Sequence, residues 1–283
     1  YHAKNAGRGQ YARFEPQMDA DAQRRREIEM DLRVAVASGA FELHYQPLVD
    51  ASSGRILACE ALLRWRHPEK GLVSPAQFIP IAEDTGLIVA IGEWVLAKAC
   101  KDAMNWPQGT RVAVNLSPIQ FKRGDVVGAV LGALRTSGLP PERLECEITE
   151  SLMMSDTPAT REAISSLCAM GVRLALDDFG TGHSSVSRLH GIPFHKLKID
   201  KSFVDKLGET PESMAIVKAI VSLARELGKT VVAEGVETRL QMDILQKLHV
   251  TELQGYFFSK PVPIADLQAK LAEPRVIKLG QAA

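Results

Sequence analysis

The 283-residue sequence has few cysteines, no surplus of charge of either sign and no long hydrophobic run. Its four cysteines are widely spaced and include no Cys-x-x-Cys pair, which argues against a zinc cage or a disulfide framework and favours a reducing compartment. Lysine plus arginine (34) equals aspartate plus glutamate (34), so no net positive field is available to hold a nucleic acid polymer. No apolar run approaches the ~20 residues that span a bilayer. A nucleotide ligand, bound by a few placed groups, is compatible with this composition.

The length suits one barrel-sized domain with a short appendage, because such barrels commonly take roughly 250 residues. Residues 1–11 begin without a methionine and resemble a helix end, a glycine turn and a strand, so the chain is expected to come from a longer protein. A helix is predicted from about Ala20 to Ser38, with Asp19 as its cap. Its Arg24-Arg25-Arg26 run is typical of a solvated linker helix.

Two strand-like runs, Phe41–Val49 and Arg55–Leu63, are separated by only five residues. Such a loop can close a hairpin but cannot carry a parallel crossover, so these strands are expected to be antiparallel. Ser74-Pro75 predicts the start of a helical stretch that continues to about Trp106. Strands then alternate with amphipathic helices such as Glu212–Leu227, and they are expected near residues 111–115, 144–148, 172–177, 195–199, 230–234 and 252–258. This order predicts an α/β fold, a TIM-like (β/α)8 barrel with one antiparallel strand.

Most of the short apolar runs that predict these strands end in a polar side chain. The residues are Glu60, Asn115, Glu147, Asp177 with Asp178, Lys198 with Asp200, Glu234 and Gln254. Acids at the ends of buried strands are costly unless something satisfies them. One such acid could be a helix cap or part of a core ion pair, but the repeated placement indicates one shared polar site at the carboxyl ends of the strands. We favour a metal site.

The same residues lie in a series of ordered motifs. They are Glu60-Ala61-Leu62, Asn115-Leu116-Ser117, Glu147-Ile148-Thr149-Glu150, Asp177-Asp178-Phe179-Gly180-Thr181-Gly182, Lys198-Ile199-Asp200, Glu234-Gly235-Val236-Glu237 and Gln254-Gly255-Tyr256. From about Phe41 to Pro263 the chain resembles the EAL-domain cyclic di-GMP phosphodiesterases. The resemblance implies a barrel with one antiparallel strand and metal-dependent hydrolysis of cyclic di-GMP to linear pGpG. It also implies two Mg²⁺ or Mn²⁺ ions per site, with Ca²⁺ as an inhibitor.

The resemblance assigns a role to each matching residue. The implied metal ligands are Glu60, Asn115, Glu147, Asp177, Asp178 and Glu234, with Asp177 bridging two ions. The implied catalytic residues are Lys198, which holds the attacking water, together with Glu60, Asp178 and Glu234. The implied substrate contacts are Gln46, Leu63, Arg64, Glu237 and Gln254, of which Arg64 binds phosphate and Gln254 completes the shell of the metal and water. For Glu237, a role in structuring its loop is left open.

The resemblance also implies a regulatory loop. Its residues are Phe179, Gly180, Thr181, Gly182, His183, Ser184 and Ser185, anchored by Glu150, and it links metal occupancy to a homodimer interface formed by the barrel. The family usually carries Tyr where this chain has His183. This residue could change the packing or the pH response of the loop, or it could be a solvent-side substitution without effect on the loop.

The domain organisation follows from the same match. Residues 1–18 resemble the end of a GGDEF domain, 19–39 form a linker helix, 40–270 form the EAL barrel, and 271–283 form a tail. A GGDEF domain is therefore expected upstream in the full-length chain. The expected location is the bacterial cytoplasm, with a membrane anchor left open for upstream segments.

Two other functions remain compatible with the sequence. The domain could be a catalytically weak sensor that only binds cyclic di-GMP, or a barrel enzyme that cleaves a different phosphodiester. Measuring whether pGpG is released, or cyclic di-GMP is only bound, distinguishes the phosphodiesterase from the sensor. Activity against a panel of cyclic dinucleotides distinguishes it from an enzyme with another substrate.

Overall fold

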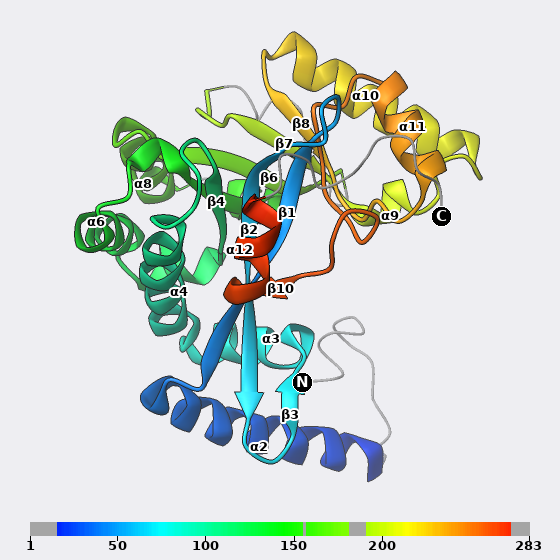
Figure 1. The fold of residues 1–283 in the computed structure, drawn as a ribbon. Helices are drawn as coiled ribbons and strands as arrows, with labels where there is room; N and C mark the ends of the chain where they lie inside the picture. The colour runs from blue at the N-terminus through cyan, green and yellow to red at the C-terminus, as the bar shows by residue number, and fades with distance from the viewer. Residues whose placement is uncertain (1–15, 155–156, 181–190, 273–283) are drawn as a thin grey trace.

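A closed eight-stranded barrel forms the centre of the computed structural model, which describes residues 16–154, 157–180 and 191–272 (Figure 1). In ring order the strands are β1 (Phe41–Asp50), β2 (Ile56–His67), β4 (Arg111–Leu116), β5 (Leu144–Thr149), β6 (Arg173–Phe179), β7 (Lys196–Ile199), β8 (Thr230–Ala233) and β9 (Glu252–Leu253). Strand β1 pairs antiparallel with both β2 and β9, whereas the other neighbours in the ring pair parallel. The predicted TIM-like barrel with one antiparallel strand is confirmed.

Helices connect the strands and cover the outside of the barrel (Figure 1). They are α3 (Pro75–Thr85), α4 (Ile88–Ala103), α5 (Pro118–Arg123), α6 (Val126–Ser137), α7 (Glu150–Met154), α8 (Pro158–Ala169), α9 (Lys201–Val204), α10 (Pro211–Glu226), α11 (Arg239–Lys247) and α12 (Ile264–Ala272). Side-chain caps start several of them, as Ser117 does for α5 and Thr238 for α11, each in a capping box with a glutamine three residues later. In the described part of the chain, no helix has the length and apolar character needed to cross a bilayer.

Among the residues that the structure describes, buried apolar side chains form two separate clusters. The larger cluster joins the outer side of the strands to the helices, and Cys59 and Cys146 belong to it. The smaller one contains Leu48, Ala58 and Val232, which alternate along their strands with members of the larger cluster. Because neighbouring residues of a strand face opposite sides, the smaller cluster lies inside the barrel.

A charged layer lies inside the barrel at the amino ends of the parallel strands. The Lys196 ammonium donates to Glu145 Oε1 at 2.6 Å and to Glu252 Oε2 at 2.7 Å, and Arg111 Nη2 donates to Glu252 Oε1 at 2.9 Å. Lys196 and Glu145 have no exposed surface, so the pair depends on these hydrogen bonds to offset the cost of burying the charges. Lys198 points to the same side of β7 two residues later, which places a second charged layer nearer the carboxyl ends.

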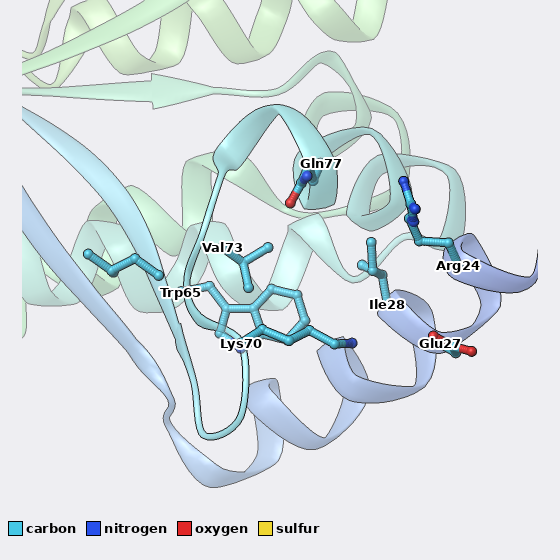
Figure 2. Close-up of a pocket in the computed structure, with 8 residues that line it drawn as sticks. Arg24, Glu27, Ile28, Trp65, Lys70, Val73 and Gln77 are labelled. Atoms are coloured by element: carbon cyan, nitrogen blue, oxygen red, sulfur yellow. The ribbon is translucent and has the colours of Figure 1, made fainter. Parts of the chain in front are cut away.

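The N-terminal helix α2 (Pro16–Ser38) lies beyond the barrel, against α3 and the hairpin of β2 and β3 (Gly71–Val73) (Figure 1). Leu32 of α2 is buried in this contact. Asp31 of the same helix accepts hydrogen bonds from His67 Nε2 at 3.0 Å and Lys70 Nζ at 2.8 Å. A cavity of about 280 Å³ remains between these elements (Figure 2). Its lining includes Arg24, Ile28, Trp65, Lys70, Val73 and Gln77, none of which is a predicted site residue.

The structure differs from several sequence-based predictions of element boundaries. Helix α2 begins at Pro16, so Asp19 lies within the helix and does not cap it. Strand β9 ends at Leu253 and not at 258, because the chain then turns and packs against the segment after β8. The predicted helical stretch from Ser74 to about Trp106 is confirmed as two helices, α3 and α4, and α3 ends at Gly86, which has a positive φ of 82°.

Candidate active site

Seven of the predicted site residues lie near the carboxyl ends of the paired segments of the barrel strands. Each belongs to a different strand or directly follows one, so closure of the barrel brings together residues that are far apart in the sequence. They are Glu60 on β2, Asn115 on β4, Glu147 on β5, Asp177 on β6, Lys198 on β7, Glu234 after β8 and Gln254 after β9. Glu60, which lies within the long strand β2, stands one residue before the end of the pairing of β2 with β4.

The ammonium of Lys198 forms the centre of an acidic cluster. Its Nζ lies 2.7 Å from Glu147 Oε2, 3.1 Å from Asp177 Oδ1 and 2.6 Å from Glu234 Oε1. Lys198 is 1% exposed and Glu147 has no exposed surface, whereas the Glu234 side chain is 20% exposed. Among the described residues, Asp177 and Glu234 are therefore the partners of the ammonium whose side chains reach the surface.

Amide side chains hold Glu60 beside this cluster. Asn115 Nδ2 donates to Glu60 Oε1 at 2.7 Å, and Gln254 Nε2 donates to Glu60 Oε2 at 2.6 Å. Gln254 Nε2 also donates to Gln46 Oε1 at 3.1 Å, and Gln46 Nε2 donates to the carbonyl of Ser259 at 3.0 Å. Glu60, Gln46 and Gln254 are all buried, so this network fixes the carboxylate in one orientation.

The adjacent aspartates lie on an irregular part of β6. Asp178 has a positive φ of 55°, which is uncommon for a residue with a side chain, and the pairing of β6 with β7 shifts register between Leu176 and Phe179. Beyond the irregularity, Glu150 Oε2 accepts a hydrogen bond from the amide of Gly180 at 3.2 Å. The shift interrupts the regular alternation of β6 at the two neighbouring carboxylates, Asp177 and Asp178.

The predicted regulatory loop is only partly described. Phe179, which the resemblance assigns to the loop, is the last residue of β6, pairs with Ile199 and is 5% exposed. Gly180 directly follows the strand with a φ of 95°, and its amide donates to Glu150 Oε2, the carboxylate that the resemblance assigns as the anchor of the loop. Thr181, Gly182, His183, Ser184 and Ser185 lie outside the described residues.

The carboxylates of the mouth outnumber the single ammonium. Burial raises the pKa of Glu147 well above its ordinary range, and the neighbouring acids raise it further against the opposing effect of Lys198. Burial also raises the pKa of Glu234, to about 8. Burial lowers the pKa of Lys198, but the surrounding carboxylates outweigh this effect and raise it, so the ammonium stays charged. Fully ionised, these carboxylates would carry more negative charge than Lys198 balances, so a polyvalent cation would favour the loss of their protons.

The donor set fits a hard divalent cation such as Mg²⁺ or Mn²⁺, because every candidate ligand binds through oxygen. Glu147 Oε1 is buried and has no hydrogen-bond partner among the described residues, which leaves it available as a ligand. In the part of the chain that the structure describes, no three acidic, histidine or cysteine side chains are arranged as a metal cage. The Lys198 ammonium instead lies between the carboxylates that would form one.

Three predicted substrate contacts lie outside the cluster. Arg64 is half-buried on β2, donates to the carbonyl of Leu63 at 2.9 Å and lies within electrostatic range of Glu60. The Leu63 side chain packs against the larger apolar cluster. Glu237 is exposed and forms an ion pair with Lys201.

The sequence analysis missed the lower charged layer around Lys196. The signal was available in the spacing, because Lys196 and Glu145 stand two residues before Lys198 and Glu147 and so share their side of β7 and β5. The alternation of side chains along the short strands was applied only to the residues that end them, and not to the residues two positions earlier.

The raised pKa of Glu234 predicts a pH-dependent stability for the metal-free protein. An unfolded glutamate ionises near 4.5, so between 4.5 and about 8 the folded protein retains a proton that the unfolded chain has lost. The contribution of this residue to stability therefore falls as the pH rises through that window. We expect the melting temperature in EDTA to fall less from pH 5 to pH 8 in Glu234→Gln than in wild type. An equal or larger fall of the melting temperature with pH in Glu234→Gln would contradict the raised pKa of Glu234.

The closed barrel and its acid-rich mouth define a TIM-like barrel protein whose polar site is built from oxygen ligands and one lysine. The chain belongs to the EAL domain family, whose sequence model matches residues 29–261.

Characterised relatives share most of this chain. MucR of Pseudomonas aeruginosa, a bifunctional diguanylate cyclase/cyclic di-GMP phosphodiesterase, is 45% identical over 276 residues, which cover 96% of this chain and 40% of MucR. The cyclic di-GMP phosphodiesterase NbdA of the same organism is 38% identical over 292 residues, which cover 100% of this chain and 37% of NbdA. A solved structure of the PaMucR phosphodiesterase in complex with c-di-GMP is 44% identical with a TM-score of 0.81, over 85% of this chain and 99% of that one. Overall, the chain spans about a third of the length of its curated relatives.

Proposed function

We propose that this chain hydrolyses one phosphodiester bond of cyclic di-GMP and releases linear pGpG, using two divalent metal ions. The observation that supports this most directly is the convergence of Lys198, four carboxylates and two amides at one end of the barrel. The relatives MucR and NbdA are named as cyclic di-GMP phosphodiesterases, which supports the choice of substrate. Turnover of cyclic di-GMP in Mg²⁺, with chromatographic identification of the product, tests the proposal.

We assign the metal ligands on the resemblance and on the oxygen donors at the mouth. Glu60, Asn115, Glu147 and Asp177 would hold one ion, and Asp177 and Asp178 would hold the second, with Glu234 completing the shell. Bound there, the ions would acidify a water molecule and stabilise charge on the phosphoryl oxygens.

The chain's own residues supply orientation and charge. Lys198 donates hydrogen bonds from a charged, buried ammonium, and in this proposal it holds the attacking water and stabilises the developing negative charge. Gln254 and Asn115 fix Glu60 through hydrogen bonds, so the carboxylate needs little reorganisation during the reaction. The Arg64 guanidinium would bind two phosphate oxygens, for which its planar fork is suited. We propose Gln46, Leu63 and Glu237 as further substrate contacts.

Calcium is expected to support binding of cyclic di-GMP without supporting its hydrolysis. An all-oxygen site would accept Ca²⁺, but Ca²⁺ binds at about 2.3–2.6 Å with loose geometry, against about 2.0–2.1 Å and near-octahedral angles for Mg²⁺. Longer bonds polarise water less and shift it from the line of attack. Calorimetry of binding and a parallel assay of pGpG in each metal measure both properties. Similar turnover in Ca²⁺ and Mg²⁺ would mean that the ions only position the substrate.

We further propose a homodimer formed through the barrel near the loop after β6, on the resemblance alone. Sedimentation across a series of protein concentrations is expected to show a dimer whose dissociation lowers the specific activity. Full activity of a monomer at every concentration would show that dimerisation is not required.

The domain division is likewise a proposal. Residues 1–18 would end an upstream GGDEF domain, and residues 19–39, of which 19–38 belong to α2, would connect it to the barrel of residues 40–270, with 271–283 as a tail. The cytoplasmic location in a bacterium belongs to the same proposal.

A further inference from the structure

Ser117 makes contacts that the proposed mechanism does not use. It completes the Asn115-Leu116-Ser117 motif directly after β4, and its hydroxyl donates to Glu83 Oε1 at 2.7 Å. Glu83 is half-buried on α3 and lies 34 positions earlier in the chain. Ser117 therefore connects the carboxyl end of β4, where Asn115 lies, to a helix of the outer layer.

The hydrogen bonds of Ser117 fix both its backbone and its side chain. Its amide donates to Gln120 Oε1 at 2.9 Å, and its Oγ accepts from the amide of Ile119 at 3.1 Å. A hydroxyl group has only one proton to donate, and the Glu83 carboxylate accepts it. Gln120 is 3% exposed, and a Cβ atom on Gly92 would collide with it, so α5 packs against α4 as closely as glycine permits. Ser117 therefore has little freedom to move.

The end of α3 that carries Glu83 is held on two sides. The Asp84 carbonyl accepts a hydrogen bond from Arg123 Nη1 at 3.3 Å, and the Asp84 carboxylate forms an ion pair with Arg25 of α2. Gly86 ends the helix, and its amide donates to the Glu83 carbonyl at 3.2 Å. Because this turn contacts both α2 and α5, the Glu83 carboxylate is an acceptor in a set place.

The backbone of β4 is paired on one side only where Asn115 lies. Asn115 is opposite Glu147 of β5, but the pairing of β4 with β2 ends at Val114. The Asn115 side chain nevertheless donates to Glu60 Oε1, toward β2, at 2.7 Å. A residue that must hold its amide in one orientation there gains precision from a fixed neighbour, because a shift of the backbone moves the side chain with it.

We propose that Glu83 is a positioning residue, whose hydrogen bond to Ser117 fixes the end of β4 and so orients Asn115 toward Glu60 and the metal ion. The inference rests on the proposed function, in which Asn115 and Glu60 are metal ligands, and it extends that function to a residue on an outer helix. Glu83 itself touches neither the substrate nor the ion. Partners that orient a ligand in this way act on metal affinity, because they set the geometry of a ligand that they do not replace.

The alternative is that the hydrogen bond between Glu83 and Ser117 only stabilises the packing of α3 against α5. The two roles differ in what they change in the folded protein. A purely structural bond contributes to the melting temperature and leaves the affinity of the folded protein for the ion unchanged. A positioning bond contributes to that affinity.

The test measures Mn²⁺ binding to the purified chain by calorimetry, without substrate, together with the Mg²⁺ dependence of cyclic di-GMP turnover. Glu83→Ala removes the acceptor and is expected to raise the Kd for Mn²⁺, and the Mg²⁺ concentration at half-maximal rate, about tenfold. In contrast, kcat at saturating Mg²⁺ is expected to change little, because the ligands themselves remain.

Two conservative variants separate the hydrogen bond from the charge. Glu83→Gln keeps an oxygen that can accept from Ser117, so it is expected to retain the wild-type affinity for Mn²⁺. Glu83→Asp keeps the charge but draws the carboxylate back toward α3, so it is expected to behave as Glu83→Ala does, and it gives the same comparison if Glu83→Ala does not fold. The control Glu93→Ala removes an exposed acid on α4, outside this contact, and is expected to change neither constant.

The outcomes separate the role of Glu83 from the proposed function. Wild-type turnover, with a lower melting temperature but unchanged metal affinity in Glu83→Ala and Glu83→Asp, would overturn the role and leave the function standing. Equally weak metal binding in Glu83→Gln and Glu83→Ala would also overturn it, since the charge and not the hydrogen bond would then matter. Weakened Mn²⁺ binding in Glu83→Ala, in a chain that binds cyclic di-GMP without hydrolysing it, would support the role and overturn the function. If the wild-type chain neither binds Mn²⁺ nor hydrolyses cyclic di-GMP, both are wrong.

Discussion

Replacing Glu60 by alanine is expected to lower turnover of cyclic di-GMP by ~10²-fold or more, the scale of losing one key electrostatic group in an active site. Glu60 lies at the barrel mouth, is 6% exposed, and accepts hydrogen bonds from Asn115 at 2.7 Å and Gln254 at 2.6 Å. Its loss removes a proposed metal ligand and the acceptor of the Asn115 amide, whereas Gln254 keeps its hydrogen bond to Gln46. Initial rates in saturating Mg²⁺ measure the effect.

Stability must be measured alongside activity, because Glu60 is buried and its removal breaks two hydrogen bonds, each of which contributes about 0.5–1.5 kcal/mol. Circular dichroism and thermal melts of Glu60→Ala and the near-isosteric Glu60→Gln separate unfolding from loss of a ligand. Both variants should fold and both should be inactive, since an amide oxygen lacks the carboxylate's charge. The control Glu69→Ala removes an exposed acid on the β2–β3 turn and should be as active as wild type. Near-normal turnover in folded Glu60→Ala would refute the assignment of Glu60.

Lys198→Ala is expected to bind cyclic di-GMP with little change in Kd but to hydrolyse it at least ~10²-fold more slowly. The Lys198 ammonium touches three carboxylates at 2.6–3.1 Å and, in the proposed mechanism, holds the attacking water. Single-turnover rates and equilibrium binding, measured on the same preparation, separate chemistry from affinity.

The same substitution should destabilise the metal-free protein, because removing one partner of a buried ion pair costs about 3–5 kcal/mol. Mg²⁺ or Mn²⁺ would neutralise the remaining acids, so we expect these ions to raise the melting temperature more in Lys198→Ala than in wild type. Lys218→Ala, which removes an exposed lysine on α10, should leave activity and stability unchanged. Weakened binding with unchanged turnover at saturation would make Lys198 a substrate contact.

Much of the fold could be predicted from local features of the sequence. The five-residue connection between the first two strands allowed only an antiparallel pair, and β1 is indeed antiparallel to β2. The polar residues that end each apolar run predicted the mouth of the barrel, because the carboxyl ends of parallel strands meet at one end. The motifs then identified the family.

Features that depend on distant contacts could not be predicted in this way. Strand β9 stops at Leu253 because the following turn bonds to Val236, a contact invisible in local periodicity. The contact of Lys198 with Glu147, Asp177 and Glu234 depends on closure of the barrel, which sets the distances between strands. The ion pairs of Lys196 with Glu145 and Glu252 likewise join residues more than 50 positions apart.

The most direct test of the proposed function is incubation of the purified chain with cyclic di-GMP and Mg²⁺, followed by chromatography and mass spectrometry of the nucleotides. Hydrolysis adds one water molecule, opens the ring at one P–O bond and leaves the second phosphodiester intact. The proposal predicts linear pGpG as the product, no product in EDTA, and product formation at least ~10²-fold slower in Glu60→Ala. Tight binding of cyclic di-GMP without pGpG in Mg²⁺ or Mn²⁺ would contradict it and would favour a sensor that only binds the nucleotide.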